Sequence, residues 1–159
     1  SSHVIGEIGK GFPILEGAID KGILAVGAEA VGAMEVLYKS TVEYCKTREQ
    51  FGQPIGKFQV LQHRMVDMFM EHEQSKSLLF MAAIKMSSGD EAEKKRSISA
   101  LKVQVGKSGR FVGQNAIQLH GGMGMTDELN IGHYFKRLTA IETLFGNVDH
   151  HLKKYSNVA

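Results

Sequence analysis

The sequence predicts an all-α protein: an up-and-down bundle of three long helices followed by short C-terminal helices. Apolar residues recur with the 3.6-residue period of a helix over three stretches of roughly 30 residues each. Short segments separate these stretches, so neighbouring helices must run antiparallel. No stretch shows a convincing strand pattern, in which apolar and polar residues would alternate.

Composition places the chain among ordinary globular proteins. Of its 159 residues, 43% are hydrophobic and 23% are charged, which is enough for one domain with a core. A net charge of +2 gives no reason to expect a nucleic-acid partner. The single cysteine, Cys45, cannot form an internal disulfide and is expected to be buried. We therefore expect an intracellular protein without a membrane span, cytoplasmic or, in a eukaryote, in the mitochondrial matrix.

The first 12 residues show no helical period and are predicted to be a connector from a preceding domain. Pro13 suits a first helical turn, and the first helix is expected to run from there to Lys46. One face of this helix carries mostly small residues: Ala18, Gly22, Ala25, Glu29, Gly32 and Val36. A bulkier stripe lies beside it: Ile19, Ile23, Val26, Ala30, Ala33 and Leu37.

Residues 47–56 are predicted to be a loop, because Gly52, Pro54 and Gly56 interrupt the helical pattern. A second helix should cover residues 57–88. A turn over residues 87–90 then leads to Asp90, a good N-cap for the third helix.

The third helix should end near His120, with an apolar stripe formed by Ile98, Leu101, Val105, Val112, Ala116 and Leu119. Three glycines at helical spacing leave one side of it nearly bare and indicate close helix contact: Gly106, Gly109 and Gly113. Short helices are expected over residues 127–138 and 147–155.

The third helix stops at a glycine-rich turn, Gln118-Leu119-His120-Gly121-Gly122-Met123-Gly124. Glycine can adopt positive φ and lets another molecule approach the backbone, and bare amides in such a turn can bind a phosphate. Glycines also end helices for purely structural reasons, so this motif alone decides nothing.

A second stretch changes the interpretation: Thr47-Arg48-Glu49-Gln50-Phe51-Gly52-Gln53-Pro54-Ile55. Together with Phe58-Gln59, Asp67-Met68 and the glycine turn, in this order and spacing, it resembles the C-terminal helical domain of the acyl-CoA dehydrogenases over nearly the whole chain. A full subunit of that family has two more domains on the N-terminal side. The resemblance thus implies that residues 1–12 are a connector from a missing N-terminal β domain and that residues 13–159 are the helical bundle domain.

The resemblance also implies an activity. Members bind FAD and remove two hydrogens from an acyl-CoA thioester: a carboxylate takes the α proton, and the flavin takes the β hydrogen as hydride. Expected partners are therefore an acyl-CoA substrate, an electron-transfer acceptor protein and further subunits, in a homo- or hetero-oligomeric dimer or tetramer.

By the same resemblance, Arg48 would pair with the FAD pyrophosphate, for which its planar fork of donors is suited. Phe51 and Gln59 would line the cofactor, and Asn147 replaces a threonine that would touch the flavin. Four residues of the glycine turn would hold the adenosine-diphosphate part of an FAD bound mainly to a neighbouring subunit: Gln118, Gly121, Gly122 and Gly124.

The family's catalytic glutamate is absent from both of its usual places. Alignment puts one of them on Phe145 and the other on Gly22, and neither residue accepts a proton. Three explanations stay open: a nearby acid replaces the base, a partner subunit carries it, or the alignment slips by a helical turn. The nearby acids are Glu142, Glu29 and Asp20.

The ending Leu144-Phe145-Gly146 resembles the small-subunit type of hetero-oligomeric acyl-CoA dehydrogenases, which act in dicarboxylic-acid or steroid side-chain breakdown. Other possibilities are a non-catalytic FAD-binding subunit of a mixed assembly, an acyl-CoA oxidase and a cofactor-free helical assembly module. We expect no metal site, because the adjacent His150 and His151 would point roughly 100° apart on a helix.

Overall fold

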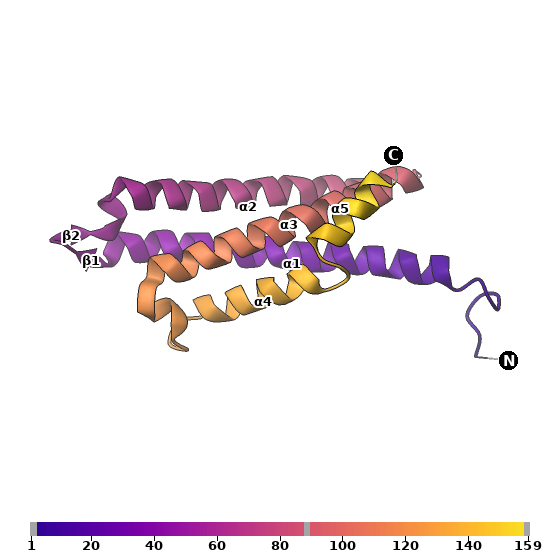
Figure 1. Ribbon diagram of the computed structural model, residues 1–159, viewed down its shortest axis with the longest axis horizontal. Coiled ribbons are helices and arrows are strands. Elements are labelled where there is room, and N and C mark those ends of the chain that lie inside the picture. Colours follow the sequence, from indigo (N-terminus) through magenta and orange to yellow (C-terminus); the bar gives the residue numbers. More distant parts are fainter. Residues whose placement is uncertain (1–2, 88–89, 158–159) are drawn as a thin grey trace.

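The computed structural model describes residues 3–87 and 90–157, and helices dominate it (Figure 1). Three long helices form an up-and-down bundle: α1 (Phe12–Thr47), α2 (Gln59–Met86) and α3 (Glu91–His120). A short 3₁₀ turn, η2 (Gly121–Met125), leads to two shorter helices, α4 (Ile131–Thr143) and α5 (Val148–Ser156). The predicted all-α fold class is confirmed. No helix in the described part of the chain is both long and apolar enough to cross a membrane.

Helix α3 lies at the centre of the bundle and packs against the other four α-helices. All six residues of its predicted apolar stripe are buried: Ile98, Leu101, Val105, Val112, Ala116 and Leu119. The glycine face receives α4 and α5. A Cβ added to Gly106 would lie 2.7 Å from Val148, and one added to Gly113 would lie 2.6 Å from Phe135. The bare side predicted for this helix is therefore a close helix contact.

The segment after α1 differs from the predicted loop, because it contains a small hairpin. Strands β1 (Glu49–Gln50) and β2 (Gln53–Pro54) pair antiparallel, and a single 3₁₀ turn, η1 (Ile55–Lys57), follows. Phe51 and Gly52 connect the strands with φ values of 55° and 77°. Two positive φ angles match the twist that a two-residue hairpin turn requires.

Several helix boundaries also differ from expectation. The second helix begins at Gln59 rather than at residue 57, because η1 occupies the first turn. Its predicted end at Ser88, and part of the turn over residues 87–90, lie outside the described residues. The helix predicted over 127–138 instead spans Ile131–Thr143, because the buried Ile141 extends the apolar side formed by Ile131 and Leu138.

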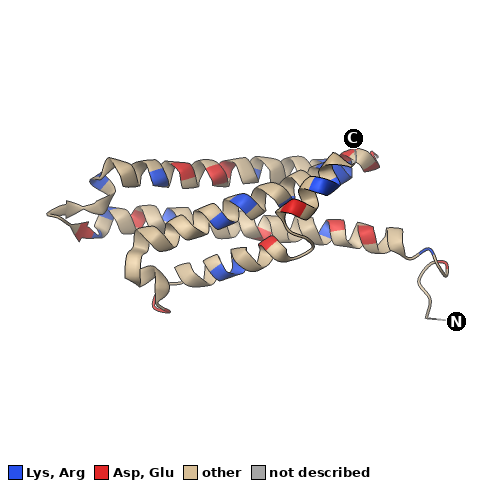
Figure 2. Cartoon of the chain, in the orientation of Figure 1, with Lys and Arg blue, Asp and Glu red and all other residues tan. Residues whose placement is uncertain are grey.

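Two helices begin at residues that cap them through a side-chain oxygen. The Asp90 carboxylate accepts hydrogen bonds from the backbone N–H groups of Ala92 and Glu93, as predicted. The side chain of Asn147 likewise accepts from the backbone N–H of His150 and starts α5. Cys45 is fully buried, as expected. Figure 2 shows positive and negative residues interspersed along the long helices.

Candidate functional site

A cavity of about 410 Å³, the Arg48 cleft, opens where the end of α1 and the hairpin meet the end of α3. Arg48 lines this cleft together with three predicted cofactor-binding residues of the glycine turn, Gln118, Gly121 and Gly122. Some 70 residues of sequence separate Arg48 from that turn. The other lining residues are Tyr44, Gln50, Ile55, Leu119, His120 and Met123.

Arg48 gives the cleft its charge. Its side chain is exposed at the C-cap of α1, and no carboxylate of the described residues forms an ion pair with it. No Asp or Glu is among the residues that line the cleft with it. The cleft therefore offers an uncompensated guanidinium to a ligand, which is the arrangement that suits an anion with paired oxygens.

A stacked ring pair forms one wall of the cleft. The rings of Tyr44 and His120 lie 4.4 Å apart at 29°. The Nδ1 of His120 is 2.8 Å from the carbonyl of Ala116, and burial lowers the pKa of His120, so the ring is neutral near pH 7 and donates from Nδ1. Sequence reasoning named neither ring as a site residue, although Tyr44 stands one helical turn before Arg48.

The glycines of the turn have different roles. Gly121 has φ 60° and ψ −139°, a conformation that is essentially restricted to glycine, and nothing crowds the space beside it. Gly124 is buried behind the cleft and does not line it. A Cβ there would lie 2.9 Å from the carbonyl oxygen of Ile117, so Gly124 lets the turn fold back on α3.

Two of the predicted cofactor-binding residues lie outside the cleft. Phe51 stands at the hairpin tip with 91% of its surface exposed. Its only ring partner in the described part of the chain is Phe58, in an edge-on arrangement with ring centroids 6.1 Å apart. Gln59 is exposed at the first position of α2. Both are accessible to a ligand or a chain that approaches this end of the bundle.

The loop between α4 and α5, residues 144–147, brings together the two positions that lack the expected glutamate. A Cβ added to Gly22 would lie 3.0 Å from the ring of Phe145, so the phenyl group fills this space. Phe145 has a φ of 60°, which costs a non-glycine residue about 1–3 kcal/mol. Such strain marks the loop as a candidate functional element.

The predicted acids occupy three separate environments. Glu142 lines a cavity of about 580 Å³ with Asn147, and its carboxylate is 3.8 Å from Arg110. Glu29 is bound by both nitrogens of the Arg137 fork at 2.5 and 2.7 Å, and these hydrogen bonds lower its pKa. A carboxylate held in this way is a weak base.

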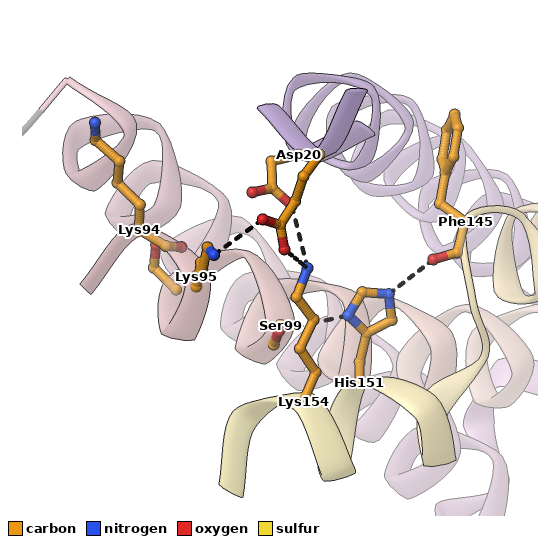
Figure 3. Close-up of polar contacts among 9 residues, drawn as sticks. Asp20, Lys94, Lys95, Ser99, Phe145, His151 and Lys154 are labelled. Atoms are coloured by element: carbon orange, nitrogen blue, oxygen red, sulfur yellow. Dashed lines mark hydrogen bonds and ion pairs between the residues drawn. The ribbon is translucent and has the colours of Figure 1, made fainter. Parts of the chain in front are cut away.

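The third acid, Asp20, is buried on α1 and faces Lys154 of α5 at 3.6 Å (Figure 3). Beside it, a largely apolar cavity of about 400 Å³ is lined by Phe145 and by Glu16, a carboxylate that sequence reasoning missed. A hydrogen bond from Lys95 lowers the pKa of Glu16, with Lys154 contributing. The available signal for Glu16 was its place on α1, one helical turn before Asp20.

Comparison with known proteins identifies the family. The family described as "Acyl-CoA dehydrogenase, C-terminal domain" matches residues 9–156. The chain belongs to the acyl-CoA dehydrogenase family.

Individual proteins and solved structures are also similar to this chain. The short-chain specific acyl-CoA dehydrogenase of Megasphaera elsdenii is 33% identical over 141 residues, which cover 86% of this chain and 35% of that protein. A structure described as the FAD complex of PigA is 28% identical with a TM-score of 0.89, covering 96% of this chain and 39% of that one. The steroid acyl-CoA dehydrogenase structure Tcur3481-Tcur3483 is 27% identical with a TM-score of 0.83. The match covers 87% of this chain and 38% of that one. The chain thus spans less than two fifths of the length of these relatives.

Within this acyl-CoA dehydrogenase domain, the cleft and the loop lie far apart. Gly22, which packs on Phe145, and Arg48 are separated by 26 residues of one continuous helix, or about 39 Å at 1.5 Å per residue. Figure 1 shows the hairpin at one end of the bundle and the α4–α5 connection well along it. The predicted cofactor residues therefore form two groups, one at Arg48 and one at Asn147.

Proposed function

We propose that this chain is the C-terminal domain of an FAD-dependent acyl-CoA dehydrogenase, in which it binds FAD and joins subunits. The convergence of Arg48, Gln118, Gly121 and Gly122 on one cleft carries this proposal. The relatives that share the fold include a protein whose structure is described as an FAD complex.

The residues of the Arg48 cleft fit part of a dinucleotide. A diphosphate needs cationic and N–H donors, and the unpaired guanidinium of Arg48 and the open backbone at Gly121 and Gly122 meet this need. The stacked rings of Tyr44 and His120 add a flat surface beside them. A volume of about 410 Å³ lies within the range of small-molecule sites, although the cleft is open.

The exposure of the residues at the Arg48 end favours a cofactor shared between chains. Arg48, Phe51 and Gln59 are all exposed there. Asn147 lines a separate cavity beside Gly106, which is 12 residues of α3, or about 18 Å, from Gln118 of the cleft. We infer that Arg48 serves a cofactor whose flavin lies against a neighbouring subunit, in a homo- or hetero-oligomer.

At the loop, this chain would orient the flavin and the substrate. Bound FAD would supply the acceptor for the β hydrogen of an acyl-CoA, and an electron-transfer protein would reoxidise it. The side-chain oxygen of Asn147 accepts a hydrogen bond from the N–H of His150, so the NH₂ group of Asn147 remains as a donor. Asn147 lines the cavity that this donor would serve. Glu142 lines the same cavity and is one candidate base.

A non-catalytic role within a mixed assembly is the second candidate function. Phe145 and Gly22 fill the family's two base positions with a phenyl ring and a bare backbone, while Glu29 and Glu16 are held by cations. One relative, the steroid acyl-CoA dehydrogenase Tcur3481-Tcur3483, is named for two gene products. In such an assembly the partner would contribute the carboxylate.

Replacing Arg48 tests the proposed function in the full-length protein. Arg48→Ala should weaken FAD binding roughly 10- to 100-fold, because a hydrogen bond to a charged group contributes about 1.5–3 kcal/mol. Arg64→Ala is the matched control, since Arg64 is exposed on α2 and does not line the cleft. Flavin absorbance after dialysis, measured with the isolated protein and with a co-expressed partner, reads out binding. Wild-type protein that holds no FAD in either form would refute the proposal.

A further inference from the structure

A completely buried lysine reaches the α4–α5 loop from the middle of α3. The ammonium group of Lys102 donates to the carbonyl oxygens of Glu142 at 2.9 Å and of Gly146 at 2.7 Å. None of the described carboxylates forms an ion pair with it. A buried cation is costly unless its protons are bound. These two carbonyls bind them, and the negative charge of Glu142 also favours the charged form.

A buried histidine holds the same loop from the other side. His151 is 1% exposed, and its Nε2 lies 3.0 Å from the carbonyl oxygen of Phe145 (Figure 3). Because a carbonyl can only accept, Nε2 carries the proton. The Nδ1 atom faces the hydroxyl of Ser99 at 3.5 Å.

Two carbonyls of the loop and one in the last turn of α4 are thus bound by two buried side chains. The loop needs such support, because Phe145 has a φ of 60° and Gly146 a φ of 103°. A phenylalanine released from this conformation would return to negative φ and carry its ring away from Gly22. The carbonyls also follow the C-terminal end of α4, where a cation is favoured by the helix dipole.

We propose that Lys102 and His151 are positioning residues that clamp the backbone of residues 142–146. The clamp holds Phe145 over Gly22, and it keeps Asn147 at the cavity that Asn147 lines with Glu142. Lys102 lines neither the cavity of Glu142 nor that of Phe145, and His151 lines only the latter. Both are proposed to act through the loop. The clamp itself follows from these contacts alone, whereas its consequence for cofactor binding rests on the proposed function.

Hydrogen exchange of the full-length protein tests the clamp. Lys102→Met keeps the length of the side chain and removes its donors. It should accelerate exchange at least tenfold at the amides of residues 144–151, while the amides of α1 and of the middle of α2 keep their wild-type rates. Lys94→Met is the control, because Lys94 also lies on α3 but pairs with the exposed Glu91. Unchanged exchange in the loop, or equal acceleration throughout the bundle, would overturn the proposal.

A second variant covers the case in which Lys102→Met does not fold. His151→Phe keeps a ring of similar size, removes the bond to Phe145 and the longer contact with Ser99, and should accelerate exchange in the same segment. Loop exchange at the wild-type rate in a folded His151→Phe protein would overturn the clamp.

FAD affinity separates this inference from the proposed function. Both variants should bind FAD at least threefold more weakly, because Asn147 loses its position. Faster loop exchange with unchanged FAD affinity would support the clamp and refute its link to the cofactor. Normal FAD binding by Arg48→Ala, together with faster loop exchange in Lys102→Met, would refute the proposed function and leave the clamp supported.

Discussion

Acidification should destabilise this chain through His151 more than through an ordinary histidine. The pKa of His151 is lowered from 6.5 to about 4, chiefly by burial; the hydrogen bond to Phe145 opposes this shift, and the nearby cations Lys102, His150 and Lys154 contribute to it. In the unfolded chain the same group titrates near 6.5. Between these two values the unfolded state binds more protons, so the free energy of unfolding falls as the pH falls.

The expected size follows from the two pKa values. Their difference of about 2.5 is worth at most about 3.4 kcal/mol at 1.36 kcal/mol per pKa unit. Most of the loss develops below pH 6.5, and about 2 kcal/mol should be gone at about pH 5. The stability is fully present above the unfolded pKa and is lost progressively as the pH approaches about 4.

Urea unfolding followed by circular dichroism at several pH values measures this effect. The reference is His151→Gln, which cannot titrate, while the buried His72 and His120, whose pKa values burial also lowers, remain in both proteins and cancel. Between about pH 7.5 and about pH 5, the wild type should lose about 2 kcal/mol more than the variant. Parallel stability curves for the two proteins would show that His151 does not titrate as its burial requires.

Three further predictions concern packing and the base. Gly113→Ala should destabilise the chain in urea by about 1–3 kcal/mol, because its Cβ would lie 2.6 Å from a phenyl ring of α4. Gly17→Ala, which meets nothing within 4 Å, should be neutral or stabilising, and equal losses would contradict this explanation. Phe145→Glu in the full-length protein should create or increase flavin reduction by an acyl-CoA; no gain in a protein that holds FAD would argue against that site. Glu142→Gln should lower turnover with an electron acceptor at least tenfold if Glu142 is the base, whereas Glu29→Gln should not, and unchanged turnover in both favours a base from a partner.

The helices and the cleft could be predicted because their signals are periodic or local. The buried stripe of α3 repeats every three to four residues, and the glycines opposite it share that period. Arg48 and Gly121 each stand directly at a helix end, where capping residues are recognisable. The hairpin was missed because its strands have two residues each, too few for alternation to show, and its turn depends on a positive φ at Phe51.

The clamp could not be predicted, because a lysine on an amphipathic helix normally reaches solvent. Nothing in the sequence around Lys102 indicates that α4 and α5 cover it and supply two carbonyls. The sequence drew attention to His151 only in the argument against a metal site, whereas the fold buries it as a neutral donor. Burial of a polar side chain is decided by elements that are distant in sequence, and single-sequence patterns do not report it.

Under the proposed assembly, the exposed hairpin tip has a consequence for a copy of the protein that is not yet assembled. Phe51 keeps 91% of its surface in water, on a turn with two positive φ angles. Chaperones and quality-control proteases bind exposed aromatic side chains, so an orphan copy should be retained or degraded. Burial of the Phe51 ring on assembly would then distinguish an assembled copy from an unassembled one.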